Sequence, residues 1–462
     1  MPLFLQEQSG SGAMKKNLIA GTCLNSPEVY HIMKPAAFLF LFVCLAMGAR
    51  AQKLNREEKK ILETIHASLP QHLKLLQQLV DINSGSLNIE GVKANGELLA
   101  QAFRNINFTT EWMAMPDSVK RAGHLVASTK GKKGKRLLLI GHLDTVFEPD
   151  MPANPFRMIN DSTATGQGVV DMKGGNVIIL AALHALHKNG LLKDVTITAY
   201  FTGDEENTGR PESVTRGDFI ARAKQHDVAL GFEGAQGLGI VATGRRGYAE
   251  WLINVYGEQG HSAGIFRRGY GAIYEVARII EAFRVQLGNE EYLTFNPGIV
   301  IGGTEMIYDT SKLAGAVASK INIISPAAVV HGEMRFLTTA QKDSTKARMQ
   351  RIATSQNLPG TRATISFKDG MPSMEPTAGN NRLVAVVSRV SQDLGFGTVT
   401  AGDPGQRGAG DISYVASYLD AIDGLGAEGQ GAHAPGETMN LASFEKLVQR
   451  AAILIYRLTR EK

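Results

Sequence analysis

Apolar residues follow two different patterns in the first half of this chain. Residues 55–83 and 90–105 carry apolar side chains at the three- and four-residue spacing of amphipathic helices. The segment 137–140 is instead a continuous apolar run, which is typical of a strand buried on both faces, and 195–202 is interpreted as another buried strand. A helical segment, 172–190, lies between these runs. Helices that alternate with buried strands predict an α/β domain with a mostly parallel sheet.

The pattern changes after Gly244. Residues 248–257 alternate like a half-exposed strand, and residues 269–287 have the period of a long helix. The elements that follow complete the order β-α-β-β-α-β, which is typical of a ferredoxin-like α+β arrangement. From about residue 375 the first pattern returns, and it ends in a helix over 441–458. We therefore expect an α/β domain, 52–244 and 373–462, that is interrupted by an inserted domain, 245–372.

The first fifty residues carry an export pattern. Lys34 precedes a short apolar run, 38–47, and Ala49-Arg50-Ala51 fits the small-x-small cleavage rule. We therefore expect a signal peptide cleaved near Gln52 and a periplasmic or extracellular protein. The apolar run is short for a membrane span, so an uncleaved anchor is the less favoured alternative. Residues 1–51 are excluded from the predicted fold.

Composition narrows the possible functions. The chain is 44% apolar and 20% charged, which is ordinary for a soluble globular protein, and its formal net charge is only +5. Its basic run, 130–135, is short and is interpreted as a hairpin loop, so a nucleic-acid partner is not expected. Both cysteines, Cys23 and Cys44, precede the expected cleavage site. Metal ligands in the mature chain must therefore be histidines and carboxylates.

Such residues fall at the C-terminal ends of the predicted strands, where open α/β sheets place their ligand sites. They are His142 and Asp144 in an H-x-D pair, Asp171, the acidic run Asp204-Glu205-Glu206, Glu233 and His433. Two histidines and three carboxylates suit a pair of zinc ions that share one carboxylate. A further acid beside a ligand, Glu205 next to Glu206, suits a general base that is not itself a ligand. Asp144 can accept the second ring N–H of His142.

Each of these residues also has a simpler interpretation when it is taken alone. His142 can be a structural histidine, and Asp171 can cap the helix that follows it. The acidic run can be a solvated loop, although three adjacent acids at a buried strand end repel one another unless a cation compensates. The combination of all these residues favours a metal site.

The combination resembles a known family, the co-catalytic zinc hydrolases that include carboxypeptidase G, aminoacylase, acetylornithine deacetylase and succinyl-diaminopimelate desuccinylase. The matching segments, in order, are GHLDTV, GQGVVDMKGG, TGDEE, GFEG, GRRG, GHSAG, INIISP and GAHAPGE. The resemblance implies a zinc-exopeptidase-like three-layer domain with an inserted ferredoxin-like dimerisation domain. It also implies two Zn²⁺ per chain, for which Co²⁺ or Mn²⁺ can substitute.

The resemblance also implies a role for each residue. Asp171 would bridge the two metals, with His142 and Glu233 completing one site and Glu206 and His433 the other. Glu205 would be the base and Asp144 would orient His142. His261, in the inserted domain, would reach the active site of the partner subunit, and Arg246 and Asn322 would contact the substrate carboxylate or the oxyanion. The chain departs from the family at 407–413, where RGAGDIS replaces a glycine-rich GGGSD-like loop that lines the substrate pocket.

The function that these residues imply is hydrolysis of an amide next to a free carboxylate, in small peptides or N-acyl amino acids. Because export favours scavenging over intracellular biosynthesis, a glutamate-carboxypeptidase-like activity is preferred, with an aminoacylase, deacetylase or dipeptidase as the alternative. A non-catalytic peptide- or metal-binding protein is the remote alternative, since binding alone would not need Glu205.

Overall fold

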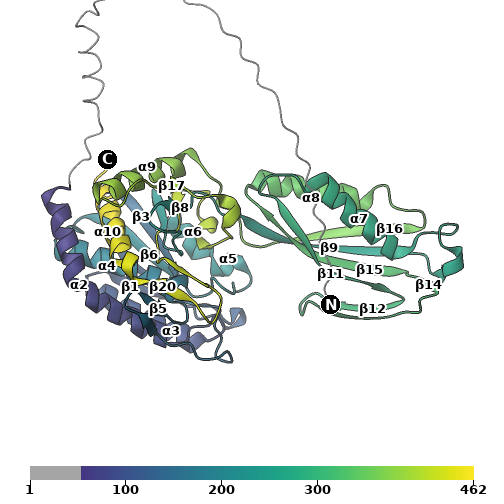
Figure 1. Cartoon of the computed structure of the whole chain (residues 1–462), viewed down its shortest axis with the longest axis horizontal. Coiled ribbons are helices and arrows are strands. Elements are labelled where there is room, and N and C mark those ends of the chain that lie inside the picture. The colour runs from purple at the N-terminus through teal and green to yellow at the C-terminus, as the bar shows by residue number, and fades with distance from the viewer. Residues whose placement is uncertain (1–53, 462) are drawn as a thin grey trace, which may run out of the picture. The chain divides into compact units, whose positions relative to one another are not determined.

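The computed structural model describes residues 54–461, so the expected export signal lies outside the described residues. The first sheet has six strands in the order β1-β2-β6-β3-β7-β18. They are β1 (Thr109–Met113), β2 (His124–Thr129), β3 (Lys133–His142), β6 (Val195–Thr202), β7 (Val228–Gly231) and β18 (Asp420–Ile422). Figure 1 labels β1, β6 and β3 of this sheet. Only β2 runs against the others, which confirms a mostly parallel sheet. The predicted hairpin at 130–135 is wrong, because β6 pairs with both β2 and β3 and separates them.

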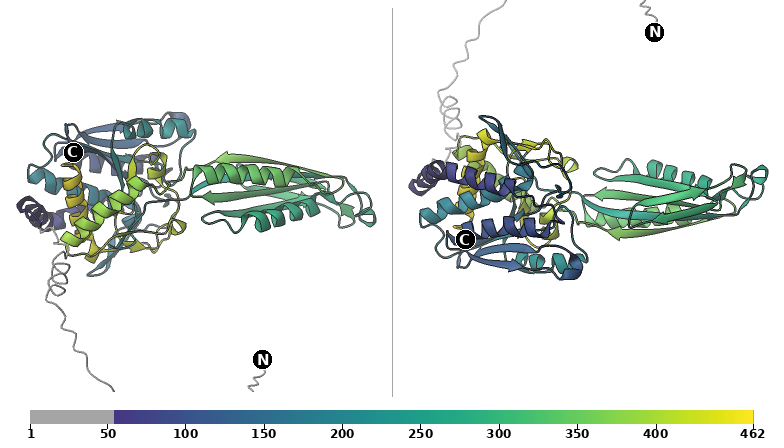
Figure 2. Two further views of the ribbon diagram at one scale, coloured as in Figure 1. Left: turned by 90° about the horizontal axis from the view of Figure 1, so that it is seen from above. Right: turned by 90° about the horizontal axis from the view of Figure 1, so that it is seen from below.

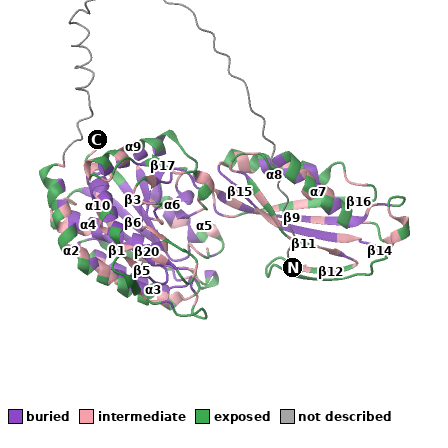
Figure 3. Cartoon of the chain, in the orientation of Figure 1, coloured by how far each residue is buried: buried purple, intermediate pink, exposed green. Residues whose placement is uncertain are grey.

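Helices cover both faces of this sheet. They are α2 (Arg56–Asp81), α3 (Ile89–Arg104), α4 (Gly174–Lys188), α5 (Glu212–Thr215), α6 (Gly217–Ala223), α9 (Ala378–Asp393) and α10 (Leu441–Leu458). Alternate residues of β3 enter two separate cores. Leu137 and Leu139 pack with α2, α4 and α10, whereas Leu138 and Ile140 pack with α6. The result is the expected three-layer domain, with buried strands between helices whose outer surfaces are exposed (Figure 3).

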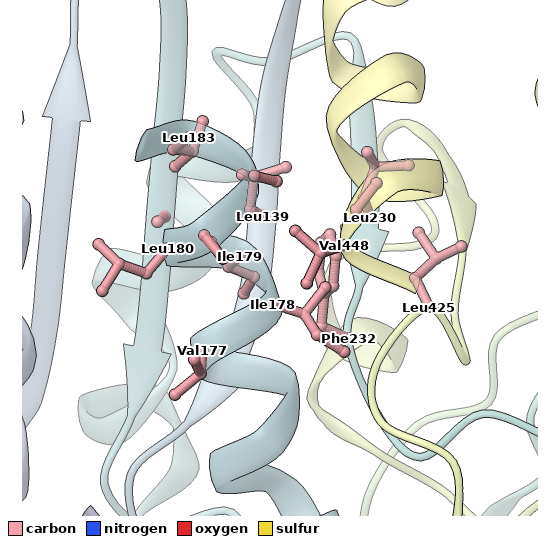
Figure 4. Close-up of a cluster of buried hydrophobic side chains, with 14 of the residues drawn as sticks. Leu139, Val177, Ile178, Ile179, Leu180, Leu183, Leu230, Phe232, Leu425 and Val448 are labelled. Atoms are coloured by element: carbon pink, nitrogen blue, oxygen red, sulfur yellow. The ribbon is translucent and has the colours of Figure 1, made fainter. Parts of the chain in front are cut away.

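Helix α4 lies at the centre of the larger core. Every residue from Val177 to Leu183 is buried, and Figure 4 shows Ile178 and Ile179 beside Leu139, Phe232 and Val448. Among the described residues, 169–188 is the helical stretch that is long and apolar enough to cross a membrane, but 89% of its most apolar window is buried within the fold. It is therefore the core helix of a folded domain.

The second sheet has four antiparallel strands in the order β11-β15-β9-β16. They are β9 (Gly247–Gly257), β11 (Thr294–Gly303), β15 (Ala327–Phe336) and β16 (Thr361–Asp369), with the helices α7 (Gly271–Leu287) and α8 (Thr339–Thr354). Both helices cover the same face (Figures 1 and 2). Trp251, Phe283 and Met349 lie in the core beneath them. The chain order β9-α7-β11-β15-α8-β16 is the expected ferredoxin-like order.

Several short elements are not predicted from the sequence. A hairpin of β12 (Glu305–Asp309) and β13 (Ala314–Ala318) follows β11, and β10 (Gly260–His261) pairs with β14 (Ile323–Ile324). In the first domain, β4 (Arg157–Asn160), β5 (Thr163–Thr165), β19 (Gly429–Gln430) and β20 (Thr438–Asn440) form a small sheet, and β8 (Ile240–Val241) pairs with β17 (Thr400–Ala401). These strands are too short to show a repeated pattern of apolar positions.

The fold brings distant chemical groups to one edge of the first sheet. His142 is the last residue of β3, Glu205 and Glu206 follow the end of β6, and Glu233 follows the end of β7. Because these three strands are parallel neighbours, their C-terminal ends meet at the same edge.

Candidate metal centre

Three groups of side chains at this edge have the spacing of metal ligands. They are His142, Asp171 and Glu233; Asp171, Glu206 and His433; and His142, Glu205 and Glu206, with the ligand atoms of each group within 4.8 Å of one another. The five predicted ligands therefore lie together in the structure. Asp171 belongs to a π-helical turn, Val169–Lys173, and does not cap α4, whose N-cap is Lys173.

Asp171 lies between the two histidines. The Nε2 atom of His142 is 3.1 Å from Oδ1 of Asp171, and the Nε2 atom of His433 is 3.2 Å from its Oδ2. His142 is also 3.7 Å from Glu233 Oε1, and His433 is 3.1 Å from Glu206 Oε2. Each carboxylate oxygen of Asp171 thus faces a different histidine, which is the arrangement that a bridging carboxylate needs.

Asp144 orients both the ring of His142 and the acidic turn, Glu205-Glu206, that follows β6. The Nδ1 atom of His142 is 3.0 Å from the carbonyl oxygen of Asp144 and 3.5 Å from its Oδ1. A proton on Nδ1 donates to these acceptors and leaves the Nε2 lone pair directed at the site. The Asp144 carboxylate also accepts the backbone N–H groups of Glu205 and Glu206, each at 3.0 Å, and the hydroxyl of Ser86 at 2.6 Å.

Glu205 differs from the other acids in how it can be used. If each histidine serves one cation, the groups around His142 and His433 use five residues and share Asp171. Glu205 occurs only in the group with His142 and Glu206, and each of these two residues already belongs to one of the other groups. Glu205 is therefore the carboxylate that remains free beside two occupied sites. Burial raises its pKa well above the usual value for glutamate, and the charges of Glu233 and Glu206 raise it further.

The charges of the cluster fit divalent cations. Burial and then Asp171 raise the pKa of Glu233 to about 7, and burial raises the pKa of Glu206. Hydrogen bonds to Asp171 and Glu206 raise the pKa of His433 to about 11. Four carboxylates beside two histidines repel one another when ionised, and two divalent cations would carry the opposite charge. Carboxylate and imidazole groups are also the ligands that zinc takes where no thiolate is present.

Asp204, the first acid of the run, has a structural role instead. Its side chain is fully buried, and it pairs with Arg216 at 2.5 Å. Arg216 also pairs with Asp411 at 2.9 Å, and Asp411 accepts the hydroxyl of Thr202. This buried network joins the end of β6 to the 407–413 loop. The three adjacent acids therefore have three different environments.

Glu437 is a buried acid near the site that sequence analysis missed. It is fully buried and accepts the backbone N–H groups of Gly168, Val170 and Asp171 at 3.0, 2.7 and 2.9 Å. It lies four residues after His433, so it connects the His433 loop to the backbone of Asp171. The only signal in the sequence is the acid that ends the GAHAPGE segment.

The other three predicted site residues are His261, Arg246 and Asn322. Among residues 54–461, His261 belongs to none of the histidine and carboxylate groups with metal-ligand spacing. His261 is exposed, and its Nδ1 accepts the backbone N–H of Ala263 at 3.2 Å. The adjacent Ser262 N–H donates to the carbonyl oxygen of Asn322, so His261 and Asn322 are close neighbours. Arg246 donates to the Thr294 hydroxyl at 3.1 Å.

Two cavities adjoin the cluster. The larger, about 720 Å³, is lined by Glu205, Glu206 and His433 together with Tyr248 and Arg335. The smaller, about 290 Å³, is lined by Asp171 and Glu233 together with two arginines, Arg245 and Arg407. Gly408 lines both cavities, so they meet at the 407–413 loop.

Comparison with known proteins identifies the family. Residues 138–457 match the family model described as Peptidase family M20/M25/M40. The chain belongs to this family. It is 28% identical to carboxypeptidase G2 from Pseudomonas sp. (strain RS-16) over 440 residues, which cover 93% of this chain and 98% of the relative. It is also 28% identical to acetylornithine deacetylase from Klebsiella pneumoniae (strain 342), over 55% of this chain and 71% of the relative.

Solved structures share the fold of this M20-family chain. The aminopeptidase PepT from Bacillus cereus has a TM-score of 0.67 at 16% identity, and covers 84% of this chain and 98% of its own. A dinuclear metal-binding M20 peptidase from Bacillus subtilis has a TM-score of 0.62 at 15% identity, and covers 86% of this chain and 100% of its own. The family resemblance inferred from the motifs is therefore confirmed. The chain is a hydrolytic enzyme, a metallopeptidase of the carboxypeptidase- and deacylase-like kind.

Replacement of Glu437 by glutamine should weaken metal binding. The amide has one acceptor oxygen, and its NH₂ group would face backbone N–H groups that now meet a carboxylate. We expect a loss of about 10- to 100-fold in zinc affinity, the usual effect of a residue that positions a ligand. Competition with a chelator measures this affinity. Glu445→Gln, on the surface of α10, is the matched control, and equal affinities in the two variants would contradict the assigned role.

Proposed function

We propose that this enzyme is an exported two-zinc hydrolase that cleaves an amide bond next to a free carboxylate. The observation that carries the proposal is Glu205, an acid that remains free beside five residues able to hold two cations. Similarity to carboxypeptidase G2 over almost the whole chain supports a carboxypeptidase-like activity on small peptides or N-acyl amino acids. Similarity to acetylornithine deacetylase, over a shorter stretch, keeps a deacylase or dipeptidase as the alternative.

The residues of the site suggest how the reaction proceeds. His142, Asp171, Glu206, Glu233 and His433 would hold two zinc ions, which would supply a Lewis acid for the amide carbonyl and lower the pKa of water. Glu205 then takes the proton from the attacking water and delivers it to the leaving nitrogen, so that the amine departs uncharged at the moment of C–N cleavage. Asp144 holds the backbone of Glu205 and the ring of His142 in place throughout. Because a binding protein would need no such base, Glu205 also argues against a non-catalytic role.

Arg335 is a candidate for binding the free carboxylate. It lines the same cavity as Glu205, pairs with Glu333 at 3.1 Å and stacks 5.1 Å from the centre of the Tyr248 ring. A guanidinium on an aromatic face offers planar donors that match a carboxylate. Arg246 and Asn322 remain proposed contacts, which the resemblance alone supports.

Two variants separate the proposed base from the proposed ligand. Glu205→Gln should retain two zinc ions per chain and lose about 10²–10⁴-fold in kcat, because the general base is missing. Glu206→Gln should instead bind less zinc. Metal analysis after dialysis against zinc, together with hydrolysis of N-acyl amino acids, measures both properties. Identical behaviour of the two variants, or an intact protein that retains no zinc, would refute this division of roles.

We also propose that the enzyme is a homodimer in which His261 completes the partner's active site. Within one chain His261 is exposed and apart from the metal-ligand groups, and it lines a small cavity with Arg267 and Arg268. An imidazole that reaches a second active site could donate a hydrogen bond to the oxyanion formed on the attacked carbonyl.

Subunit mixing tests this arrangement. His261→Ala should lower kcat by about 10²–10³-fold with little loss of zinc, because one oxyanion donor is removed. When His261→Ala subunits are mixed with Glu205→Gln subunits, heterodimers contain one complete site, so part of the activity should return. Each variant mixed only with itself is the control. Verified heterodimers without recovered activity would show that His261 does not act across the interface.

Export is proposed from the sequence alone. Mature protein isolated from its native host should begin near Gln52, because the Ala49-Arg50-Ala51 segment fits a cleavage site. Intact mass and N-terminal sequencing measure the start. A protein that still begins at Met33 would instead be held by an uncleaved anchor.

A further inference from the structure

The smaller cavity contains a positive charge that the protein does not use. Its walls carry four charged residues, namely Asp171, Glu233, Arg245 and Arg407. The two acids are the proposed metal ligands, so their charges are directed at cations. The side chains of Gln236, Gln406 and Gln430 complete the polar lining. Once cations bind and compensate the two acids, the two arginines determine the net charge of the cavity walls.

Arg245 is fully engaged within the protein. It pairs with Asp423 at 2.5 Å, and it donates to the carbonyl oxygens of Gly408 and Ala409, each at 2.7 Å. Burial alone would lower its pKa, but Asp423 and Glu233 raise it above the usual value for arginine. Arg245 therefore holds the 407–413 loop in place and has few N–H donors left for a ligand.

Arg407 is different. In the part of the chain that the structure describes, its side chain forms no ion pair and one hydrogen bond, from Nη1 to the carbonyl oxygen of Gly234 at 3.0 Å. Its Nε is buried without an acceptor. Burial lowers its pKa, and Arg245 lowers it further, as expected of a guanidinium short of partners. A half-buried arginine with spare donors in a cavity suits a carboxylate.

The position of Glu205 decides which part of a substrate enters this cavity. Glu205 lines the larger cavity and does not line the smaller one. Because Glu205 must deliver a proton to the leaving nitrogen, the amine part of the substrate lies on the side of the larger cavity. The acyl part then extends from the cluster toward Asp171, Glu233 and Arg407. Gly408, which lines both cavities, marks where the two parts would meet.

We propose that Arg407 selects substrates whose acyl part carries a carboxylate, such as N-succinyl amino acids or peptides with an acidic residue before the cleaved bond. This inference rests on the proposed hydrolytic function. In the reaction, water adds across the C–N bond, the acyl part leaves as a dicarboxylic acid and the nitrogen leaves as an amine. A volume of about 290 Å³ is at the small end of ligand pockets, so the acyl part is short.

Paired substrates that differ only in charge test this selection. N-succinyl amino acids are compared with the corresponding N-succinamoyl amino acids, in which a neutral amide replaces the distal carboxylate. Asp-X dipeptides are compared with Asn-X dipeptides in the same way. We expect the zinc-loaded enzyme to favour the anionic member of each pair by about 10- to 100-fold in kcat/KM, the usual value of a charge-assisted hydrogen bond.

Arg407→Gln should remove this preference by lowering kcat/KM for the anionic substrates alone. Arg407→Lys, which retains the charge but not the planar donors, should restore part of it. Arg104→Gln, which removes an arginine from the exposed surface of α3, is the control and should retain the full preference. A wild-type enzyme that cleaves both members of a pair equally, or an Arg407→Gln variant that loses activity on both, would overturn the proposal.

Product binding provides a readout that does not depend on turnover. In calorimetric titrations of zinc-loaded protein, succinate should bind the wild type about tenfold more tightly than succinamate, and the two should bind Arg407→Gln equally. Equal binding to the wild type would overturn the role of Arg407 while leaving the hydrolytic function intact. Failure to hydrolyse any peptide or N-acyl amino acid, with zinc bound, would instead overturn the proposed function and this inference together.

Discussion

The repulsion between buried carboxylates at one sheet edge is the constraint on which the rest of the structure depends. Asp171, Glu205, Glu206 and Glu233 meet there, and the pKa of Glu233 is raised to about 7. The neighbouring Arg245 relieves only part of this repulsion: it lowers the pKa of Glu233, but it is also paired with Asp423. Two bound cations would balance the negative charge that remains, which makes cation binding part of the stability of the edge as well as of its chemistry.

Buried charged side chains next to the candidate metal ligands, here called anchors, hold loops that have little regular structure. Asp144 fixes the acidic turn after β6 through two backbone N–H groups, and Glu437 fixes the turn of Asp171 through three. Arg216 and Asp411 fix the 407–413 loop. Each anchor is buried, and a buried charge that lost its partners would be costly. Catalytic loops can thus be irregular in path and still hold their side chains within hydrogen-bonding distance.

The sequence predicts elements where a pattern extends over many residues. The predicted strand HLVAST and the predicted final helix match β2 and α10 residue for residue. The clustering of the candidate metal ligands is predictable because parallel strands bring their C-terminal ends together. Glu437 is not predictable, because its partners are backbone N–H groups more than 260 positions away. The roles of His261, Arg246 and Asn322 come only from resemblance, since the contact inferred for His261 lies in another subunit.

The 407–413 loop is anchored by groups other than Arg407. Asp411 connects one end of the loop to Arg216, and Arg245 clamps its middle. Gly410 makes the clamp possible, because a Cβ at this position would lie 2.4 Å from the Arg245 guanidinium. Arg407 lies outside these anchors and contacts no metal-ligand side chain through a hydrogen bond among the described residues. We therefore expect a change at position 407 to alter the charge in the smaller cavity, while the groups that position Glu205 stay in place.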